Sequence, residues 1–308
     1  MPSFLDLDPL GPTEVRRILD AAHRRKAARR DRPRGAPDDD CPLNGHVLAS
    51  IFEKTSTRTR ISFEIAMRQL GGSAITMSSG DMQIGIGETI EDTARVLSRY
   101  VDIMQLRTDR HDKLLAMAEA ATVPVINGLT DDTHPCQILA DVMTVEERKG
   151  APVETTTWAW LGDGNNVCQS LIEACGLLGF ELRLSTPAAY DPDPQYAAKA
   201  EARGGKIEVV RSPAEAVADA DVVVTDTWVS MGDKDRNKRL VALSPFQVTE
   251  ELMATAAKDA VFLHCLPAHR GEEMEAAVID GPRSAVFDEA ENRVHAQKAV
   301  LLWCLGKL

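Results

Sequence analysis

The sequence predicts an α/β fold made of two doubly wound parallel-sheet domains, with the active site in the cleft between them. Short apolar runs alternate with helical patterns of about three turns along almost the whole chain, as parallel sheets wound by helices require. The alternation breaks at 150–152, Gly-Ala-Pro, and then restarts. A chain of 308 residues has room for two hydrophobic cores. Such folds bind their ligands at the carboxyl ends of the strands.

The predicted elements fall into a first domain, 1–149, and a second domain, 150–291. A last helix within 292–308 is expected to pack back on the first domain. In the first domain the expected strands are 46–52, 73–78, 101–106 and 122–127, and the expected helices are 58–70, 88–100, 112–121 and 135–149. In the second domain the expected strands are 157–161, 182–186, 207–211, 222–226 and 261–265.

The composition excludes several classes of protein. The formal charge is −12, which argues against a nucleic-acid partner because such binders neutralise phosphates with cations. The basic stretch 24–40 has no interleaved aromatic residues, so we expect a solvated helix end followed by a loop. No apolar run approaches the length of about 18 residues that predicts a membrane span, and residues 1–10 do not form a signal peptide. The six cysteines show no CxxC spacing, which predicts reduced thiols, a cytoplasmic protein and no structural metal site.

The segment 56–60, Ser-Thr-Arg-Thr-Arg, directly follows the first predicted strand. Its hydroxyls and guanidiniums lie where a helix begins, so they can converge with backbone N–H groups. A helix cap needs only one hydroxyl, and positive charge at a helix amino terminus is unfavourable beside the helix dipole. Because a bound anion offsets that cost, the segment predicts a phosphate site.

The segment 134–137, His-Pro-Cys-Gln, follows the fourth predicted strand. Pro135 suits the first position of a helix, which places His134 and Gln137 near its amino end. His134 can donate to a carbonyl oxygen, and Gln137 can accept from an amide NH₂ group. Either residue alone would be explained as a capping contact. Beside a phosphate site, the pair predicts recognition of a planar –CO–NH₂ group attached to phosphate.

Three further segments follow predicted strands of the second domain, at 162–166, 226–232 and 264–267. The first, Gly-Asp-Gly-Asn-Asn, is similar to a dinucleotide-binding fingerprint, but Val167 occupies the position of the third glycine, which disfavours NAD. Asp226 opens the second segment, where an acidic residue can either hold a cationic amine or form a turn. Cys265 lies in the third, where a cysteine serves either function or packing.

These five segments, in this order, resemble those of the ornithine carbamoyltransferases, within the aspartate/ornithine carbamoyltransferase family. The resemblance runs through nearly the whole chain and includes the segments 92–97 and 287–293. It implies transfer of the carbamoyl group of carbamoyl phosphate to the δ-amine of L-ornithine, giving L-citrulline and phosphate. It implies no metal and no organic cofactor. It also implies a cytoplasmic homotrimer that acts in arginine metabolism. We expect the biosynthetic direction, although the sequence does not decide between biosynthesis and catabolism.

The resemblance further assigns roles to individual residues. Catalytic roles fall to Arg107, His134 and Cys265. Ornithine would be bound by Asn166, Asp226, Ser230 and Met231. The loop 83–88 departs from some relatives, because it lacks the basic residue that they carry after the glycine. Carbamoyl phosphate would be bound by Ser56, Thr57, Arg58, Thr59, Gln83, Arg107, His134, Pro135, Cys136, Gln137, Cys265, Leu266 and Arg293.

Two alternatives stay open at this point. A carbamoyltransferase with another amine acceptor would keep the first two segments and need a different acceptor loop. Asp226 and Cys265 favour a cationic amino acid over aspartate, whose second carboxylate would call for extra cations. A non-catalytic paralogue that binds an anion or an amino acid in the same cleft is the other alternative. A citrulline assay separates the last case from an enzyme.

Overall fold

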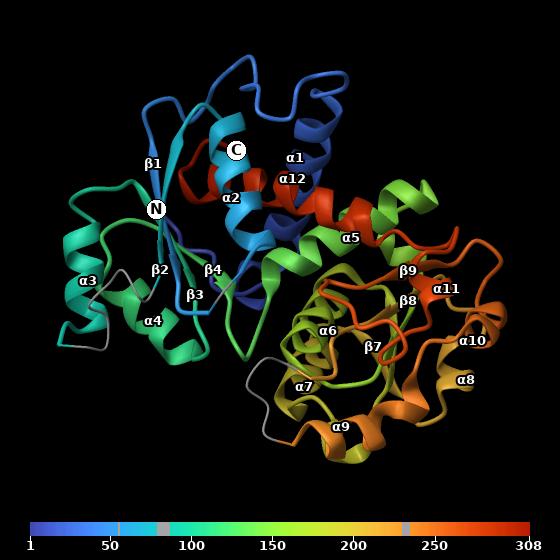
Figure 1. The fold of residues 1–308 in the computed structure, drawn as a ribbon. Helices are drawn as coiled ribbons and strands as arrows, with labels where there is room; N and C mark the ends of the chain where they lie inside the picture. The colour runs from blue at the N-terminus through green and yellow to red at the C-terminus, as the bar shows by residue number, and fades with distance from the viewer. Residues whose placement is uncertain (55, 79–86, 230–234) are drawn as a thin grey trace. The chain divides into compact units, whose positions relative to one another are not determined.

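The computed structural model describes residues 1–54, 56–78, 87–229 and 235–308 (Figure 1). Within these ranges the chain divides into two compact units. Unit 1 comprises Met1–Ala140 together with Asn292–Leu308, and unit 2 comprises Asp141–Glu291. Two helices, α5 (Pro135–Lys149) and α12 (Val286–Cys304), contribute residues to both units. The C-terminal segment of the chain therefore belongs to the same compact unit as the N-terminal segment.

Unit 1 is built on a four-stranded sheet of order β2-β1-β3-β4, in which every neighbouring pair is parallel. From β1 the chain proceeds to β2 on one side and later to β3 and β4 on the other, so the strand order reverses between β1 and β3. The loops that follow these two strands diverge, which is the usual position of a ligand site in an open parallel sheet. The strands are β1 (Val47–Phe52), β2 (Ser73–Ser78), β3 (Ile103–Arg107) and β4 (Val125–Leu129).

Helices cover both faces of this sheet, with α3 and α4 on one face and α2 on the other (Figure 1). On the first face, Ala94, Leu114 and Met117 pack in one buried cluster with strand residues such as Ile51 and Leu106. Burial of these apolar side chains is what holds the two helices to the sheet. The helices of this unit that precede α5 are α1 (Gly11–Ala27), α2 (Arg58–Gln69), α3 (Ile90–Leu97) and α4 (His111–Ala120), and a 3₁₀ turn lies at Asp8–Leu10.

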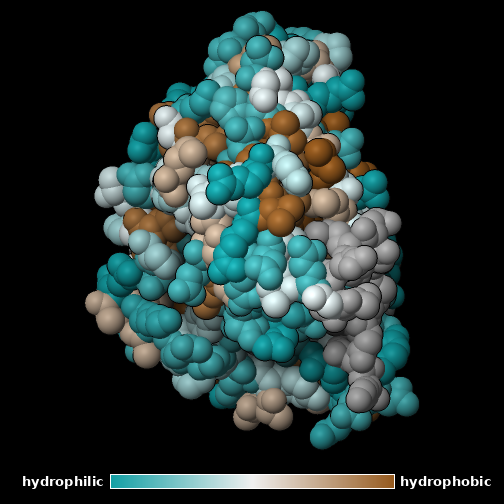
Figure 2. Space-filling model, turned by 90° about the vertical axis from the view of Figure 1, so that its left-hand side faces the viewer, coloured by the Kyte–Doolittle hydropathy of each residue, from teal (hydrophilic) through white to brown (hydrophobic). Residues whose placement is uncertain are grey.

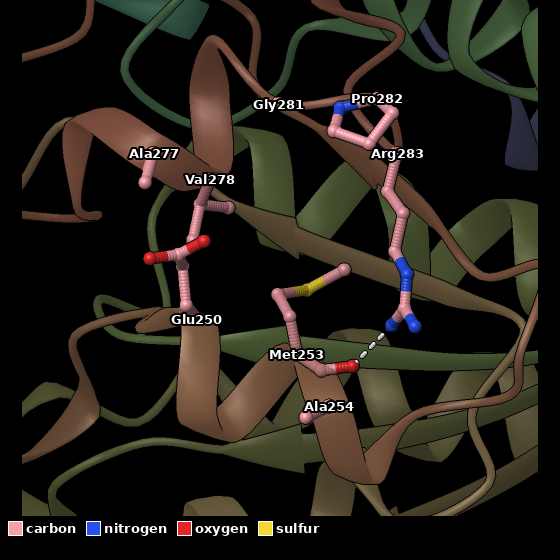
Figure 3. A pocket seen from close by; sticks show the side chains of 8 residues that line it. All are labelled: Glu250, Met253, Ala254, Ala277, Val278, Gly281, Pro282 and Arg283. Atoms are coloured by element: carbon pink, nitrogen blue, oxygen red, sulfur yellow. Dashed lines mark hydrogen bonds between the residues drawn. The ribbon is translucent and has the colours of Figure 1, made fainter.

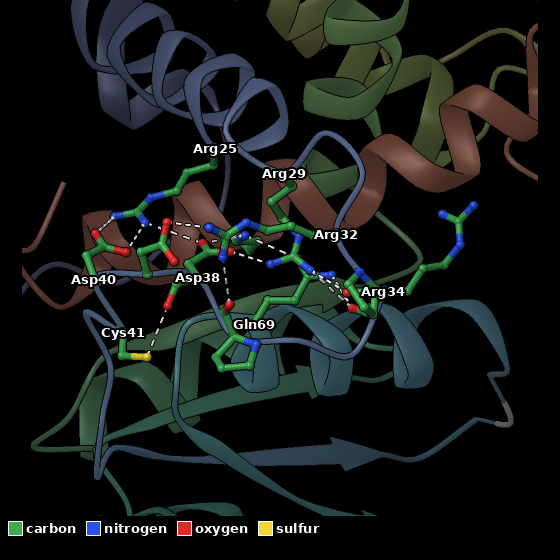
Figure 4. Close-up of polar contacts among 12 residues, drawn as sticks. Arg25, Arg29, Arg32, Arg34, Asp38, Asp40, Cys41 and Gln69 are labelled. Carbon is green, nitrogen blue, oxygen red and sulfur yellow. Dashed lines mark hydrogen bonds and ion pairs between the residues drawn. The ribbon is translucent and has the colours of Figure 1, made fainter.

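The buried carboxylate of Asp38 lies in the loop after α1, where it pairs with Arg25 of α1 and with Arg29 of the same loop (Figure 4), and it also pairs with Lys298 of α12. Asp38 accepts from Arg29 Nη1 at 2.5 Å and from Lys298 Nζ at 2.6 Å. Lys298 is fully buried and also donates to Gln69 Oε1 in α2 at 3.1 Å. Other arginines of the basic stretch also bind the loop that follows α1. Arg25 donates to Asp40, and Arg32 donates to Asp39. The basic stretch is thus a helix end followed by a loop, as expected, but the Arg29 side chain is buried against Asp38 instead of being solvated.

Unit 2 is built on a five-stranded sheet of order β7-β6-β5-β8-β9, again parallel throughout. The strand order reverses between β5 and β8, so the loops after these two strands diverge in the same way as in unit 1. The strands are β5 (Thr157–Leu161), β6 (Glu181–Ser185), β7 (Lys206–Val209), β8 (Val222–Thr225) and β9 (Val261–Leu263).

The helices of unit 2 pack on this sheet through small and apolar residues. Val217, Met253 and Val278 belong to one buried cluster with Leu161 and Phe262 of the strands. The helices are α6 (Asn166–Leu178), α7 (Pro194–Ala202), α8 (Pro213–Val217), α9 (Arg236–Leu243), α10 (Glu250–Thr255) and α11 (Ala276–Ile279), with 3₁₀ turns at Val153–Thr155, Ala188–Tyr190 and Ser244–Phe246. None of the helices in the described ranges combines the length and the apolar character that crossing a membrane requires.

The predicted fold class is confirmed, and the differences concern the ends of elements. Strand β4 runs to Leu129 rather than ending at 127. The predicted strand ends at the polar residue Asn127. In the structure its side chain is buried within the strand and donates to Leu5 O and Thr133 Oγ1. The last helix begins at Val286 rather than at 292. Its first turn carries Asp288 and Glu289, acidic residues that favour a helix start without adding to the apolar periodicity.

We predict that Lys298 makes stability depend on pH in the alkaline range. Burial lowers the pKa of its ammonium group from 10.5 to about 8, although Asp38 opposes this shift. Between these pH values the unfolded chain holds a proton that the folded chain has released, so this group makes the free energy of unfolding rise with pH. That rise should be absent in Lys298→Met and retained in Lys307→Met, which alters an exposed lysine. Urea unfolding at increasing pH measures it, and equal pH profiles for the wild type and Lys298→Met would contradict it.

Candidate active site

Three arginine side chains from distant parts of the sequence lie close together in unit 1. Arg58 begins α2, Arg107 ends β3, and Arg293 lies in α12. Arg107 Nη1 donates to Thr59 Oγ1 at 3.1 Å, and Arg293 Nη2 donates to the same oxygen at 2.9 Å. Thr59 is completely buried and Arg293 is 4% exposed. Two guanidinium groups therefore share one buried hydroxyl at the carboxyl edge of the sheet.

The amino end of α5 completes this cluster. Arg293 Nη1 donates to Gln137 Oε1 at 2.8 Å, and the Gln137 N–H donates to His134 O at 3.0 Å. The His134 side chain is buried. Burial, reinforced by the charges of Arg293, Arg107 and Arg58, lowers the pKa of His134 well below 6.5. The imidazole is therefore neutral at neutral pH, and it can donate one hydrogen bond without adding another charge.

This concentration of positive charge is costly to bury unless an anion shares the site. No acidic residue occupies the first turn of α2, where Arg58 lies against the helix dipole. Thr57 is the N-cap residue, but its side chain makes no capping hydrogen bond, so the capping explanation of this segment does not apply. The arrangement suits a phosphate dianion with an attached carbonyl group placed toward His134.

Cys136 follows Pro135 in the first turn of α5, and its buried thiol contacts the sheet. The thiol donates to Asn127 O in β4 with a sulfur-to-oxygen distance of 3.6 Å. Burial raises the pKa of this thiol to about 12. The side chain is therefore a protonated packing group that ties α5 to the sheet.

In unit 2, the loops after β5, β8 and β9 meet at Asp226. Asp226 Oδ2 accepts from Asn165 Nδ2 at 2.7 Å, and Asp226 Oδ1 accepts from the Cys265 thiol at 2.8 Å. Asn165 is also the N-cap of α6, because its Oδ1 accepts from the N–H groups of Val167 and Cys168. The carboxylate is 8% exposed. It is a fixed negative charge at the carboxyl edge of this sheet, suited to a cationic amine.

Cys265 is a hydrogen-bond donor in this arrangement. Burial raises the pKa of its thiol well above 9.0, and the charge of Asp226 and the hydrogen bond to it act in the same direction. The sulfur is therefore protonated at neutral pH and is a poor nucleophile. Asp226, His264 and Cys265 each offer one potential metal-ligand atom within 4.8 Å of the others, but the thiol proton already occupies the contact between Cys265 and Asp226. The next residue, Leu266, has a φ of 59°, so the chain turns sharply away after the thiol.

Sequence reasoning missed Arg239, which holds several loops of unit 2 together. Its guanidinium pairs with Asp163 after β5, and its Nε donates to Trp228 O after β8 at 2.7 Å. It also lies over the Tyr190 ring, 4.9 Å from the ring centre. Gly162 is necessary beside this contact, because a Cβ there would lie 2.7 Å from Trp228 Nε1. A single arginine in a charged helix gives no motif, so only the fold could reveal this contact.

Gln83, Ser230 and Met231 lie outside the described residues. The other predicted site residues divide between the two units. In unit 2, Asn165 contacts Asp226 directly, a contact that the sequence analysis did not anticipate when it selected the neighbouring Asn166. Unit 1 holds Ser56, Thr57, Arg58, Thr59, Arg107, His134, Pro135, Cys136, Gln137 and Arg293, and unit 2 holds Asn166, Asp226, Cys265 and Leu266.

A cavity of about 210 Å³ lies elsewhere in unit 2 (Figure 3). Figure 3 shows Glu250 and Arg283 on opposite sides of it, with the Met253 side chain between them. Arg283 donates to Met253 O, so its guanidinium holds α10 against the loop that follows α11. None of the predicted site residues lines this cavity. The cavity is lined by Glu250, Met253, Ala254, Ala277, Val278, Gly281, Pro282 and Arg283.

Two family models together match most of the chain. Residues 3–147 match the family domain described as "Aspartate/ornithine carbamoyltransferase, carbamoyl-P binding domain", and residues 154–304 match "Aspartate/ornithine carbamoyltransferase, Asp/Orn binding domain". The fold and the two sites thus define a two-domain α/β transferase. The chain belongs to the aspartate/ornithine carbamoyltransferase family.

Individual relatives match along the full chain. An ornithine carbamoyltransferase of Rhizorhabdus wittichii is 63% identical over 306 residues, which cover 99% of each chain. One of Caulobacter vibrioides is 57% identical over 305 residues, covering 99% of this chain and 98% of that one. The solved ornithine carbamoyltransferase from Pyrococcus furiosus superimposes with a TM-score of 0.93 at 46% identity, covering 100% of this chain and 98% of the other.

Asp226 should control the reactivity of Cys265. In Asp226→Asn the negative charge beside the thiol is lost, so the pKa of Cys265 should fall and its alkylation by iodoacetamide at mildly alkaline pH should become about threefold faster or more. Mass spectrometry of the modified peptide measures this rate. Cys41, which is partly exposed and remote in sequence, is the internal control. Equal rates for Cys265 in the wild type and the variant would show that the carboxylate does not hold the thiol proton.

Proposed function

We propose that this chain transfers the carbamoyl group of carbamoyl phosphate to the δ-amine of L-ornithine, giving L-citrulline and phosphate. The convergence of Arg58, Arg107 and Arg293 around the neutral, buried His134 carries this proposal. That cluster matches a small donor with a phosphate at one end and a planar carbamoyl group at the other. The relatives named ornithine carbamoyltransferase support ornithine as the acceptor.

In the donor half of the reaction, the arginines and the hydroxyls of 56–59 bind the phosphate. His134 donates to the carbamoyl oxygen, and Gln137 accepts from the carbamoyl NH₂ group. Negative charge builds on that oxygen when the amine attacks, and Arg107 and His134 stabilise it without reorganising at that moment. The arginines also stabilise the departing phosphate, which can itself accept the proton from the amine. Gln83 and Leu266 complete the donor site in this proposal.

In the acceptor half, Asp226 binds the α-ammonium group of ornithine. Asn166, Ser230 and Met231 bind the rest of the α-amino-acid portion, and the Cys265 thiol holds Asp226 in place through its hydrogen bond. This leaves the δ-amine as the nucleophile. It must be neutral to attack, and a free aliphatic amine has a pKa of about 10.4. The value of kcat/KM for ornithine therefore rises with pH through the neutral range.

The proposal assigns carbamoyl phosphate binding to residues 1–149 and ornithine binding to 150–291, with 292–308 returning to the first domain. It places the enzyme in the cytoplasm, as a step of arginine biosynthesis. All six cysteines are free thiols, which supports a reducing compartment.

The proposed assembly is a homotrimer in which the Gln83 loop reaches a neighbouring subunit. Figure 2 shows brown apolar groups among hydrophilic ones on one face of the molecule. Several large apolar side chains are exposed on separate helices and strands of unit 1, and a subunit interface would cover side chains of this kind. They are Ile61, Ile75, Val96, Tyr100 and Leu115.

The acceptor assignment is tested by product formation with three amines. Ornithine should give citrulline. Lysine should react poorly, because its longer side chain carries the amine past the carbamoyl carbon. Aspartate should react at least about 100-fold more slowly than ornithine, because its carboxylate would lie against Asp226. Colorimetric assay of carbamoylated product at equal enzyme concentration measures all three. Comparable rates with aspartate would overturn the acceptor assignment and leave the donor site standing.

The donor site is tested by Arg58→Gln. Loss of a charge-assisted contact to the phosphate should raise KM for carbamoyl phosphate about tenfold or more and lower kcat as well, because the same contact stabilises the leaving group. Arg60→Gln is the matched control, since it removes an exposed arginine from the same helix turn. Steady-state kinetics with saturating ornithine measures both variants. Donor saturation that is unchanged in Arg58→Gln, or equally changed in Arg60→Gln, would remove Arg58 from the site.

A further inference from the structure

The donor site uses two neighbouring loops at the carboxyl edge of the unit 1 sheet. One follows β1 and leads to Arg58, and the other begins at Arg107 at the end of β3. Phe52 pairs with Arg107 in the last step of the regular sheet. The next residue, Glu53, donates its N–H to Arg107 O at 2.9 Å. The backbone of the first loop is therefore hydrogen-bonded, at Glu53, to the strand end where the second loop begins.

The Glu53 side chain makes a second connection at this point. Its Oε2 accepts from Thr108 Oγ1 at 2.5 Å and from Lys113 Nζ of α4 at 2.8 Å. The Glu53 side chain is only 15% exposed and Lys113 is 33% exposed, so these contacts are partly shielded from water and are stronger than fully exposed ones. Lys113 also pairs with Asp109 at 3.3 Å. Although burial opposes it, the hydrogen bonds and charges of Glu53 and Asp109 raise the pKa of Lys113, so the ammonium group stays charged.

We propose that Glu53 is a positioning residue for the donor: by binding Thr108 and Lys113 it fixes the segment that carries Arg58 relative to the strand end that carries Arg107. This inference rests on the proposed function of the donor site. A carboxylate would repel a phosphate, so Glu53 acts through its protein partners and not through the ligand. Two guanidiniums on separate loops bind one small anion well only when both loops are held in place beforehand.

A second link from the same loop provides a matched comparison. Lys54, the residue after Glu53, pairs with Asp131 at 3.0 Å. Both of these side chains are about half exposed, at 46% and 58%, and exposed ion pairs contribute little. If Glu53 is a positioning residue, loss of its contact with Lys113 should weaken donor binding, whereas loss of the contact between Lys54 and Asp131 should not.

The test compares Glu53→Gln and Lys113→Met with Asp131→Asn as the control. We expect Kd for inorganic phosphate, measured by calorimetry, and KM for carbamoyl phosphate to rise about tenfold in the first two variants. KM for ornithine should stay within about twofold of the wild type. The double variant Glu53→Gln/Lys113→Met should be no weaker than either single variant, because both remove one shared contact. Asp131→Asn should match the wild type.

The opposing results are equally specific. Donor binding within about twofold of the wild type in Glu53→Gln would overturn the inference. Equal rises in KM for both substrates, together with a large fall in Tm, would show a merely structural role and overturn it as well. If Glu53→Gln does not fold, Thr108→Val removes one partner of the same carboxylate and gives the same comparison. A wild type that binds neither phosphate nor carbamoyl phosphate would reject the proposed function itself, whereas normal wild-type binding with an unaffected Glu53→Gln rejects only this inference.

Discussion

The structure of unit 1 depends on one constraint: positive charges must be held together at a point where they repel each other. Arg107 and Arg293 donate to the single hydroxyl of Thr59, and Arg58 is near enough to depress the pKa of His134 with them. Nothing in local sequence preference favours this arrangement. It persists because strand ends, helix ends and a buried hydroxyl fix each guanidinium before any ligand arrives.

Helix α12 shows how the rest of the unit serves that constraint. It carries Arg293 in its interior and Lys298 further along, and Lys298 is buried against Asp38 and Gln69. A buried ammonium contributes little net stability, but it specifies how the helix lies. Its placement in turn fixes Arg293 against Gln137. The contacts of Asp38 with Lys298 thus help to position Arg293, and with it the cluster of arginines.

The site in unit 2 has the opposite sign, because it is organised around the carboxylate of Asp226. Asp226 accepts from an amide and a thiol, which satisfy the carboxylate without neutralising it. Asn165 does this while capping α6, so the position of the charge is tied to the start of a helix. Cys265 remains protonated in this role, which explains how a cysteine can belong to a site without acting as a nucleophile.

The sequence by itself determined the fold class, the parallel order of elements and the segments where chemistry gathers, because apolar periodicity and residues such as Pro135 act locally. It also marked the phosphate segment, since Arg58 at a helix start is unfavourable unless an anion is bound. Only the tertiary structure decided which side chains meet. Arg293 reaches Thr59 across 234 positions of sequence, Glu53 joins Thr108 and Lys113, and Arg239 reaches Asp163 and Trp228. Such contacts depend on how strands and helices pack in three dimensions, and no spacing along the chain records them.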